Sequence, residues 1–339
     1  MAHVLLERPP QLGSTAVAVS AEQLARGDLE PYRRELTGYC YRMLGSGSEA
    51  EDAVQETFLR AWRNAERFEG RSSVRSWLYR IATNVCIDMH RQVQRRARPI
   101  EMGPAVPPEE SHIGPMLAPG SWVTPVADAR IEPVGSDPAE VAEHRESVRL
   151  AFISALQNLP SRQRAALILC EVLRWQAVEA AELLGTTVAG VNSALQRARA
   201  TLAALPPAPH AAPLDSADAE LLERYVDAFQ RYDIEQLVTL LHEDAVQSMP
   251  PFAMWLRGGL DIGRFMVLPE PSKCRGSRLV PTAANGCPAF GQYKIDTAGG
   301  YAPWSLQVLE VSGGRITAIN SFLDTGTVFP AFGLPPHLD

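Results

Sequence analysis

The sequence predicts a multidomain protein in which two all-α modules are followed by an α+β domain. Residues 25–98 and 141–204 both show helical periodicity with few breaks. Between them, residues 99–140 contain nine prolines, which exclude long helices and indicate a linker. After Pro250 and Pro251 the pattern changes to short apolar runs that are typical of strands. A chain of 339 residues is long enough for two or three domains of this kind.

The net charge of −7 is unevenly distributed along the chain. Residues 25–100 hold 14 basic and 10 acidic groups, and residues 141–204 hold 7 basic and 5 acidic groups. Residues 101–140 and 205–339 each carry a net charge of −6. Basic modules can contact phosphate, so the two helical modules remain candidates for nucleic-acid binding despite the acidic total.

Targeting signals and metal-binding motifs are not evident in the sequence. It contains no run of eighteen apolar residues, and Met1 to Ser20 carry a single basic residue, Arg8, with Gly13 interrupting the apolar stretch. We therefore expect a cytoplasmic protein without a membrane partner. None of the five cysteines forms a C-x-x-C pair or has a histidine at finger spacing, so we expect reduced thiols, no metal and no cofactor.

The segment from Ser48 to Trp62 predicts an amphipathic helix. Its apolar face contains Ala50, Val54, Phe58, Ala61 and Trp62. Its polar face contains Asp52, Gln55, Glu56 and Arg60. Ser48 is the expected N-cap, with Glu51 completing a capping box. Periodicity alone also allows an ordinary helix with a solvated polar face.

The segment from Ser72 to Gln92 predicts a second helix with a basic face. Its expected core positions are Leu78, Ile81, Ala82, Val85 and Met89. Trp77, Arg80, Asn84 and Arg91 lie on another side, and such a mixture of charge, amide and aromatic groups suits single-stranded DNA. The alternative is that Trp77 belongs to the core, and we expect Tyr79 to be packed inside.

Residues 177–202 predict a helix-turn-helix. The first helix covers residues 177–184, Gly185 supplies the turn, and Thr187 caps the second helix. The apolar stripe of the second helix contains Val188, Val191, Ala194, Leu195, Ala198 and Leu202. Asparagine, glutamine and arginine on its other side can read base edges in the major groove. The alternative is a helical hairpin without DNA contacts.

The amino-acid sequence of the first module resembles region 2 of the sigma-70 family. A-E-D-x-x-Q-E-x-F-L-x-A-W, at 50–62, is similar to region 2.2, and this implies that Asp52, Gln55 and Glu56 contact the RNA polymerase core enzyme. S-W-L-Y-R-I-A-T-N, at 76–84, resembles regions 2.3 and 2.4, which melt and read the −10 promoter element. The residues that this resemblance implies for the −10 element are Arg71, Ser72, Ser73, Val74, Trp77, Arg80, Asn84 and Arg91.

The second module resembles sigma region 4, which reads the −35 promoter element. The similarity lies in Leu156 to Leu169 and in V-N-S-A-L-Q-R-A-R at 191–199. The residues implied for −35 DNA are Thr187, Ala189, Asn192, Ser193, Gln196, Arg197 and Arg199. The resemblance implies core RNA polymerase and promoter DNA as partners. It also implies that the linker at 99–140 passes near the catalytic cleft of the polymerase.

Residues 217–330 resemble the SnoaL-like, ketosteroid-isomerase-type α+β cone. The similar motifs are Y-V-D-A-F-x-x-Y-D at 225–233, L-L-H-E-D-A at 240–245 and W-L-R-G at 255–258. Polar candidates for catalysis are Tyr225, His242, Asp244 and Asp296, but the sequence does not group them around one reacting atom, and we expect no enzyme. Met249, Phe252, Met254, Trp255 and Phe265 are expected either to line a ligand pocket or to form core.

The complete chain resembles extracytoplasmic-function sigma factors that carry such a C-terminal extension. The expected function is promoter recognition and transcription initiation with the C-terminal domain regulating activity in cis. One alternative is a SnoaL-like enzyme or ligand sensor fused to a DNA-binding regulator, and another is a plain repressor. The polar face around Asp52 favours a sigma factor over a repressor, because a repressor needs no contact with the polymerase.

Overall fold

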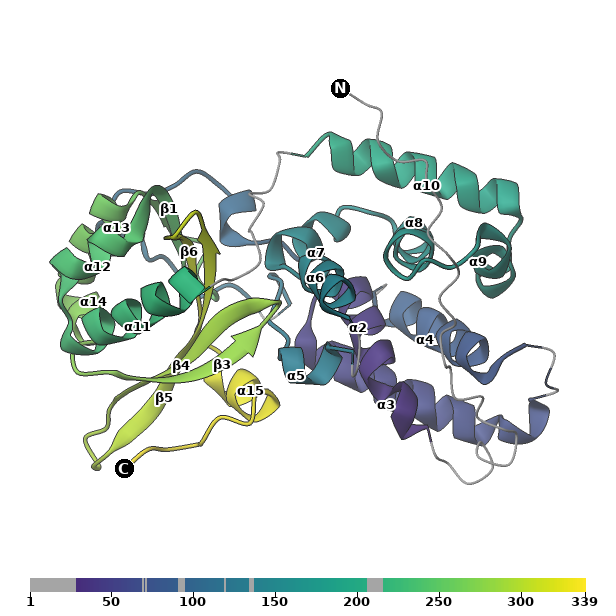
Figure 1. Ribbon diagram of the computed structural model, residues 1–339, viewed down its shortest axis with the longest axis horizontal. Helices are drawn as coiled ribbons and strands as arrows, with labels where there is room; N and C mark the ends of the chain where they lie inside the picture. The colour runs from purple at the N-terminus through teal and green to yellow at the C-terminus, as the bar shows by residue number, and fades with distance from the viewer. Residues whose placement is uncertain are drawn as a thin grey trace.

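The protein folds into a helical part and a sheet domain that lie side by side (Figure 1). The computed structural model describes residues 29–68, 70, 72–90, 95–118, 120–133, 137–205 and 216–339. The long proline-rich linker runs between the two parts and contacts both of them.

The described residues of the first module form three α-helices. They are α2 (Arg33–Leu44), α3 (Gly47–Arg63) and α4 (Val74–His90), with short 3-10 turns η1 (Glu30–Tyr32) and η2 (Ala65–Arg67). Ser46 caps α3 by accepting a hydrogen bond from the Glu49 amide, so the prediction of Ser48 as N-cap was wrong. The helix begins earlier because Gly45 ends α2 in a left-handed conformation, with φ of 70°.

Before α6, the described residues of the linker form short helical turns and contact both the first module and the sheet domain. These are η3 (Pro99–Glu101), η4 (Glu110–His112) and α5 (Asp128–Ile131). Thr124 fastens it to the turn between α2 and α3, since its carbonyl accepts from Tyr41 Oη at 2.9 Å and its hydroxyl accepts from the Gly47 amide at 3.0 Å. A Cβ atom at Gly47 would lie 2.3 Å from Pro125 O, so only glycine permits this approach.

The second module is helical, and its last two helices form the predicted helix-turn-helix. Its elements are α6 (Pro138–Glu146), α7 (Leu150–Leu156), α8 (Ser161–Leu167), the π-helical turn η5 (Ile168–Val172), α9 (Ala177–Leu184) and α10 (Val188–Ala203). Gly185 is left-handed with φ of 62°, and Thr187 caps α10 by accepting from the Gly190 amide at 3.1 Å. Both features agree with the sequence prediction.

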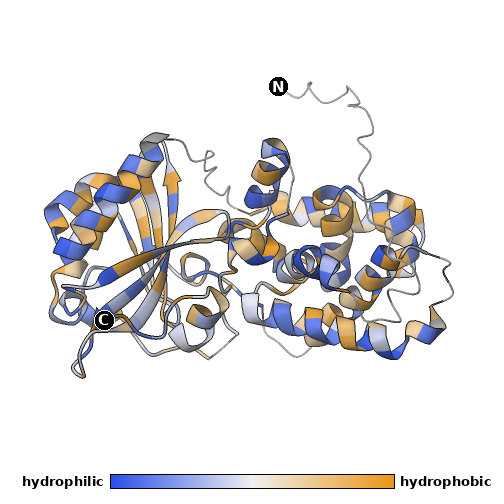
Figure 2. Ribbon diagram, turned by 60° about the horizontal axis from the view of Figure 1, so that its bottom comes forward, coloured by the Kyte–Doolittle hydropathy of each residue, from blue (hydrophilic) through white to orange (hydrophobic). Residues whose placement is uncertain are grey.

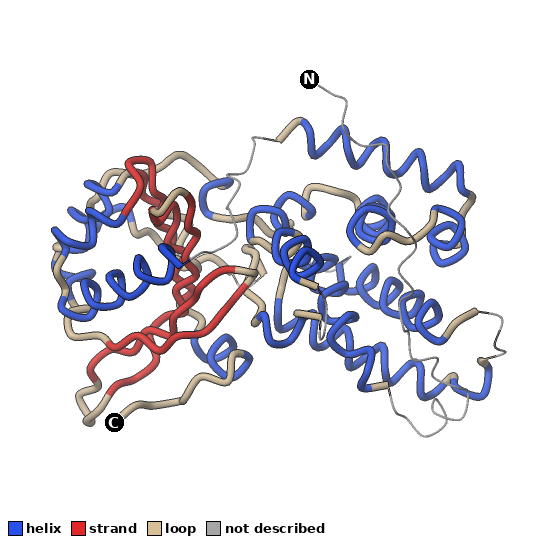
Figure 3. Tube along the Cα trace, in the orientation of Figure 1, coloured by secondary structure: helices blue, strands red, loops and turns tan. Residues whose placement is uncertain are grey.

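A six-stranded sheet with strand order β2-β1-β6-β5-β4-β3 forms the C-terminal domain. Its strands are β1 (Leu241–Ser248), β2 (Trp255–Arg257), β3 (Arg278–Ala284), β4 (Cys287–Ile295), β5 (Tyr301–Ser312) and β6 (Arg315–Phe322). Its helices are α11 (Ser216–Arg231), α12 (Ile234–Leu240), α13 (Gly259–Met266), α14 (Pro269–Ser272) and α15 (Thr325–Ala331). Helices α11 to α14 lie against one face of the curved sheet (Figure 3).

The sheet is antiparallel except where β1 pairs with β6. The turn between β5 and β6 contains Gly313 and Gly314, which are left-handed with φ of 59° and 68°. The sequence prediction missed β1 and β2. In β1 the polar residues from His242 to Asp244 are exposed and hide the strand pattern, and β2 has only three residues, too few for any periodicity.

Two apolar clusters stabilise the molecule. One fills the sheet domain between its helices and strands, and Figure 2 shows hydrophobic residues along these strands. The other starts in the first helical module, continues through the helix-turn-helix and extends to the β3–β4 hairpin and α15 of the sheet domain. The three domains therefore share a continuous core.

Candidate functional site

The outer face of α3 carries acidic, amide and apolar side chains together. Asp52 and Gln55 are exposed, and Glu56 is half-exposed and accepts a hydrogen bond from Arg60 at 2.7 Å. Leu59 and Trp62 are 47% and 64% exposed on the same helix. The prediction that Trp62 belongs to the buried face was therefore wrong. An exposed tryptophan beside charged groups is typical of protein interfaces.

The buried face of α3 explains how this surface is held in place. Ala50, Val54 and Ala61 are completely buried, as the periodicity predicted. Phe58 is only half-buried, and the Arg33 guanidinium lies 5.1 Å from its ring centroid. Glu49 forms an ion pair with Arg96, a buried arginine that also donates to the Leu44 carbonyl.

The second predicted surface, on α4, is divided between exposed and packed residues. Asn84 is exposed, while Trp77 is half-buried with its ring 5.0 Å from that of Phe68. Tyr79 is completely buried, as predicted. Trp77 thus belongs partly to the core, which is the alternative that the sequence left open.

The loop before α4 is also partly structural. Ser73 Oγ accepts from the Ser76 amide at 3.1 Å, and Ser72 is half-buried. Val74 is only 6% exposed, so it is not available to a base in this arrangement. Arg71 and Arg91, which were also predicted to contact DNA, lie outside the described residues.

The outer face of α10 is open to solvent. All seven residues predicted for the −35 element are exposed: Thr187, Ala189, Asn192, Ser193, Gln196, Arg197 and Arg199. Arg199 forms an ion pair with Glu171 at 2.7 Å. Val188 was predicted in the apolar stripe but is 42% exposed, because it occupies the first turn of the helix, beyond the packed surface.

Helix α9 packs directly against α4, so the two helical modules touch. The rings of Tyr79 and Trp175 are 5.0 Å apart, and the Arg75 guanidinium lies 5.5 Å from the Trp175 ring. Arg80 donates to the Glu182 carbonyl at 3.2 Å and lies 3.6 Å from its carboxylate. One residue predicted to contact −10 DNA is therefore engaged by the helix-turn-helix module.

The β3–β4 hairpin inserts its tip between the helical modules and the linker. Asn285, completely buried with φ of 57°, donates through its amide nitrogen to Tyr41 Oη and to the Val148 carbonyl, each at 2.6 Å. Its side-chain oxygen accepts from the Val126 amide at 3.1 Å. One side chain thus joins α2, the linker and the start of the second module to the sheet domain, and sequence reasoning did not identify it.

Asp128 on α5 forms a second contact at the same tip. Its carboxylate accepts from the Gly286 amide at 2.9 Å and is only 7% exposed. Burial raises the pKa of Asp128 to about 6, although the Gly286 hydrogen bond lowers it. Nearby, Arg130 bridges α3 and α15 by pairing with Glu51 at 2.5 Å and donating to the Ala331 carbonyl at 2.9 Å.

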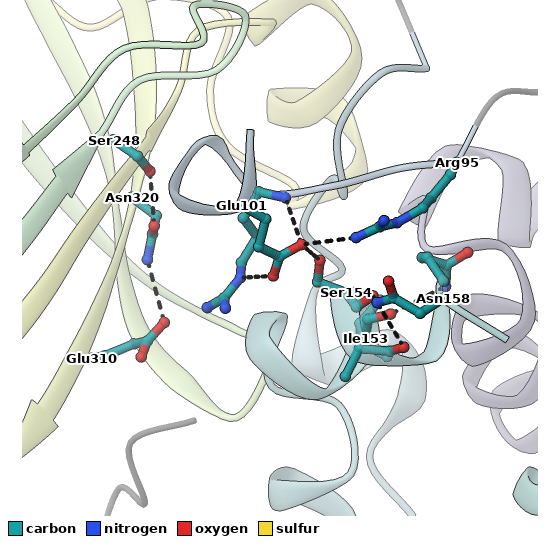
Figure 4. Close-up of polar contacts among 11 residues, drawn as sticks. Arg95, Glu101, Ile153, Ser154, Asn158, Ser248, Glu310 and Asn320 are labelled. Atoms are coloured by element: carbon teal, nitrogen blue, oxygen red, sulfur yellow. Dashed lines mark hydrogen bonds and ion pairs between the residues drawn. The ribbon is translucent and has the colours of Figure 1, made fainter. Parts of the chain in front are cut away.

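The start of the linker is fastened to α7 by Glu101 (Figure 4). Its carboxylate accepts from Ser154 Oγ at 2.5 Å and from Arg98 Nε at 3.0 Å, and lies 3.9 Å from Arg95. Figure 4 also shows a polar chain inside the sheet domain, from Ser248 through Asn320 to Glu310. The Glu101 contacts thus fix the start of the linker to the second helical module, whereas the Ser248–Asn320–Glu310 chain joins strands β1, β6 and β5 of the sheet domain.

The sheet domain contains a cavity of about 800 Å³. Of the five residues expected to line a pocket, Met249, Phe252 and Phe265 do so. Met254 and Trp255 are buried core residues that do not line it. Ile113 and Met116 of the linker also form part of the wall.

The four residues considered for catalysis do not meet at this cavity. Asp244 pairs with Arg257 at 3.1 Å on the surface, His242 is exposed and Asp296 is half-buried. Tyr225 is buried and donates to Gln307 Oε1 at 2.8 Å. None of the four is among the described residues that line the cavity.

Family models match both helical modules. The model for Sigma-70 region 2 matches residues 29–96, and that for Sigma-70, region 4 matches residues 149–202. The ECF RNA polymerase sigma factor SigG of Mycobacterium tuberculosis is 43% identical over 322 residues, which cover 92% of this chain and 85% of SigG. The chain belongs to the ECF family of RNA polymerase sigma factors.

The matches also include relatives of this ECF sigma factor with a similar overall fold. SigJ of Mycobacterium tuberculosis is 30% identical over 246 residues, covering 71% of each chain. The SigJ crystal structure covers 91% of this chain with a TM-score of 0.57 at 21% identity. The predicted fold is confirmed, with helical sigma regions followed by a SnoaL-like α+β domain. No described helix of the sigma factor is long and apolar enough to span a membrane.

Proposed function

We propose that this sigma factor binds core RNA polymerase through the α3 face and reads the −10 and −35 elements through α4 and α10, while its C-terminal domain regulates it in cis. In the arrangement described above, which we call the closed arrangement, α9 lies on α4 and the β3–β4 hairpin contacts both modules. The polymerase-binding residues Asp52 and Gln55 remain exposed. In the closed arrangement the α3 face is therefore accessible to core polymerase, although the two modules are not positioned to read a promoter.

The contact between α4 and α9 is the observation that carries this proposal. The −10 and −35 elements are separated by roughly 25 base pairs, or about 85 Å of double helix. Two modules in contact, with the ring centroids of Tyr79 and Trp175 only 5.0 Å apart, cannot lie on both elements at once. Promoter recognition therefore requires the modules to separate.

The linker is long enough to permit that separation. Fully extended, its roughly forty residues reach about 140 Å. In the closed arrangement the linker is instead fixed to α7 by Glu101 and to the turn after α2 by Thr124. Its release would free it to pass through the polymerase, and its net charge of −6 suits a channel that holds nucleic-acid phosphates.

We assign the C-terminal domain a regulatory role rather than a catalytic one. The polar residues considered for catalysis lie outside the cavity, and Glu270, the carboxylate among the described lining residues, is exposed and paired with Lys273 at 2.5 Å. The alternative of an enzyme fused to a DNA-binding regulator lacks a buried general base among these residues. We place the protein in the cytoplasm, where the polymerase acts.

The substitution Asn285→Ala tests the regulatory role. It removes three side-chain hydrogen bonds that join the domains, so it should favour the open state. We expect several-fold more run-off transcript with purified core polymerase. Thr282→Ala on β3 is the matched control, and thermal unfolding checks that both variants are folded. A lower yield from folded Asn285→Ala would show that the C-terminal domain supports initiation instead.

A further inference from the structure

The wall of the cavity in the sheet domain is completed by the linker. We propose that this cavity binds a largely apolar, neutral or anionic organic molecule that carries a hydrogen-bond donor, and that the bound molecule holds the linker on the domain. The regulatory part of this inference rests on the proposed function.

The size and lining of the cavity fit such a molecule. Its volume of about 800 Å³ lies within the range of small-molecule sites. Helices α11 to α13, the turn between α11 and α12, and strand β6 supply apolar and aromatic side chains to the wall. These include Phe229, Tyr232, Leu237, Phe265, Met266 and Ile319.

One polar atom in the cavity wall lacks a partner. Gln247 Oε1 is buried and, among the described residues, has no hydrogen-bond partner. The neighbouring amides are satisfied, because Gln292 Oε1 accepts from Ser305 and Gln307, and Gln307 Oε1 accepts from Tyr225. A buried acceptor without a donor destabilises a protein, so a ligand hydroxyl or N–H at this atom would be favourable.

The charged residues of the cavity wall favour a neutral or anionic ligand, because Glu270 is paired with Lys273 and Lys294 remains as a second lysine. Lys294 Nζ lies 3.3 Å from the centroid of the Trp304 ring, and both residues line the cavity. Lys294 is half-buried, and this burial lowers the pKa of its ammonium group. An anionic or electron-rich group would stabilise this charge, whereas a cationic ligand would be repelled.

The linker contributes backbone and side chains to the cavity mouth. Met116 forms a β-bridge with Phe252, and the Leu117 amide donates to the Pro251 carbonyl at 3.0 Å. Ile113 packs against the apolar cluster of the sheet domain. A molecule that contacts Ile113 and Met116 binds the docked linker better than the released one, so occupancy must shift the equilibrium toward docking.

Binding can be tested with 8-anilinonaphthalene-1-sulfonate, an aromatic anion with an N–H donor whose fluorescence rises in apolar sites. We expect saturable binding to the full chain and about tenfold weaker binding to Gln247→Leu. Thermal stability of that variant should not fall, because the substitution removes an unpaired buried group. Gln163→Leu on α8 is the matched control and should bind as wild type. Absence of saturable binding, or wild-type affinity in folded Gln247→Leu, would overturn the site.

Linker docking can be followed by glutamyl endopeptidase cleavage at exposed Glu109. Saturating probe should slow this cleavage in wild type and in Met102→Ser, a linker methionine that does not line the cavity. In Met116→Ser the protection should be lost. Equal protection in both variants would exclude the coupling. These readouts are independent of transcription, so their failure is distinguishable from failure of the proposed regulation.

Discussion

Asn285 illustrates how a single amide can join three parts of a chain. Its nitrogen uses both hydrogens, on Tyr41 Oη and Val148 O, while its oxygen accepts from Val126 N. An aspartate of the same size could not donate, and its charge would face the Val148 carbonyl. The geometry therefore requires an amide, and the left-handed φ of 57° suits asparagine better than most residues.

At Asp128 the closed arrangement should depend on pH. The pKa is raised to about 6 in the closed state, against about 3.9 for an exposed aspartate. The raised pKa means that the closed arrangement favours protonated Asp128. The stability that this preference gives the closed arrangement is complete below about pH 4 and is lost as the pH rises through about 6. Between these two limits the stability of the closed arrangement changes by about 3 kcal/mol at most. Glu132 raises the pKa, and Arg145 and Arg149 lower it.

The measurement is the radius of gyration by small-angle X-ray scattering between pH 5 and 8. Wild type should expand as the pH increases, and Asp128→Asn should remain compact throughout. Identical profiles for the two proteins would rule out Asp128 as the source of any pH effect.

Residues of this kind were not predicted from the sequence. The Asn285-Gly286 pair is typical of a hairpin turn, but the pattern cannot show what the turn contacts. Gln247 likewise lies in a strand whose exposed charges concealed it. Both roles depend on neighbours more than 70 residues away, which no local pattern encodes.

At the scale of elements, local pattern was more informative. The helix-turn-helix followed from Gly185 and Thr187, because their backbone requirements are local. The α3 face was predicted apart from its cap and Trp62, whose exposure depends on where the packed surface ends. Which residues of α3, α4 and α10 contact polymerase or DNA stays a prediction.

For α3 we predict that Asp52→Ala with Glu56→Ala weakens core polymerase binding by a few kcal/mol, as hot-spot truncation does. The matched control is Glu223→Ala with Asp227→Ala on α11, which has the same spacing and a similar arginine pair, Asp227 with Arg231. Affinity is measured by titrating labelled protein with core enzyme. Equal affinities for both double variants would refute the assignment of this face.

For α10 we predict that Arg197→Ala costs about 1–3 kcal/mol and relaxes base preference at one position of the −35 element. Arg197 is exposed on the outer face, so it is available to DNA. Arg231→Ala in the C-terminal domain is the control. Binding to a promoter library at several salt concentrations measures the effect, and an unchanged profile would remove Arg197 from the interface.

At the scale of the whole molecule, the sequence predicted the separate domains but not how they pack against one another. From the sequence, Tyr79 and Trp175 are expected to be ordinary core residues of their own modules. In the structure they contact each other across the boundary between the two modules. The prolines predicted a linker between the two helical modules, but they gave no sign that these modules touch each other. Such contacts arise from surfaces that exist only after each module has folded.

We predict that truncation after Leu205 raises run-off transcription by core polymerase, because it removes the hairpin that joins the modules. It also exposes apolar residues of the shared cluster, so solubility should decrease. If charge contributes to docking, added salt should change the transcript yield of the full chain by a different factor from that of the truncated chain. Equal transcription by both at every salt concentration would contradict regulation in cis.

The place of the β3–β4 hairpin in the chain has a consequence during synthesis. Both promoter-reading modules leave the ribosome before the hairpin does, and β1 must wait for β6 to complete the sheet. At about 5–20 residues per second, the 134 residues after Leu205 take roughly 7–27 s to be made. Each newly made molecule therefore passes through a period in which its sigma modules are folded but unrestrained, and polymerase that is close to the ribosome could capture it then.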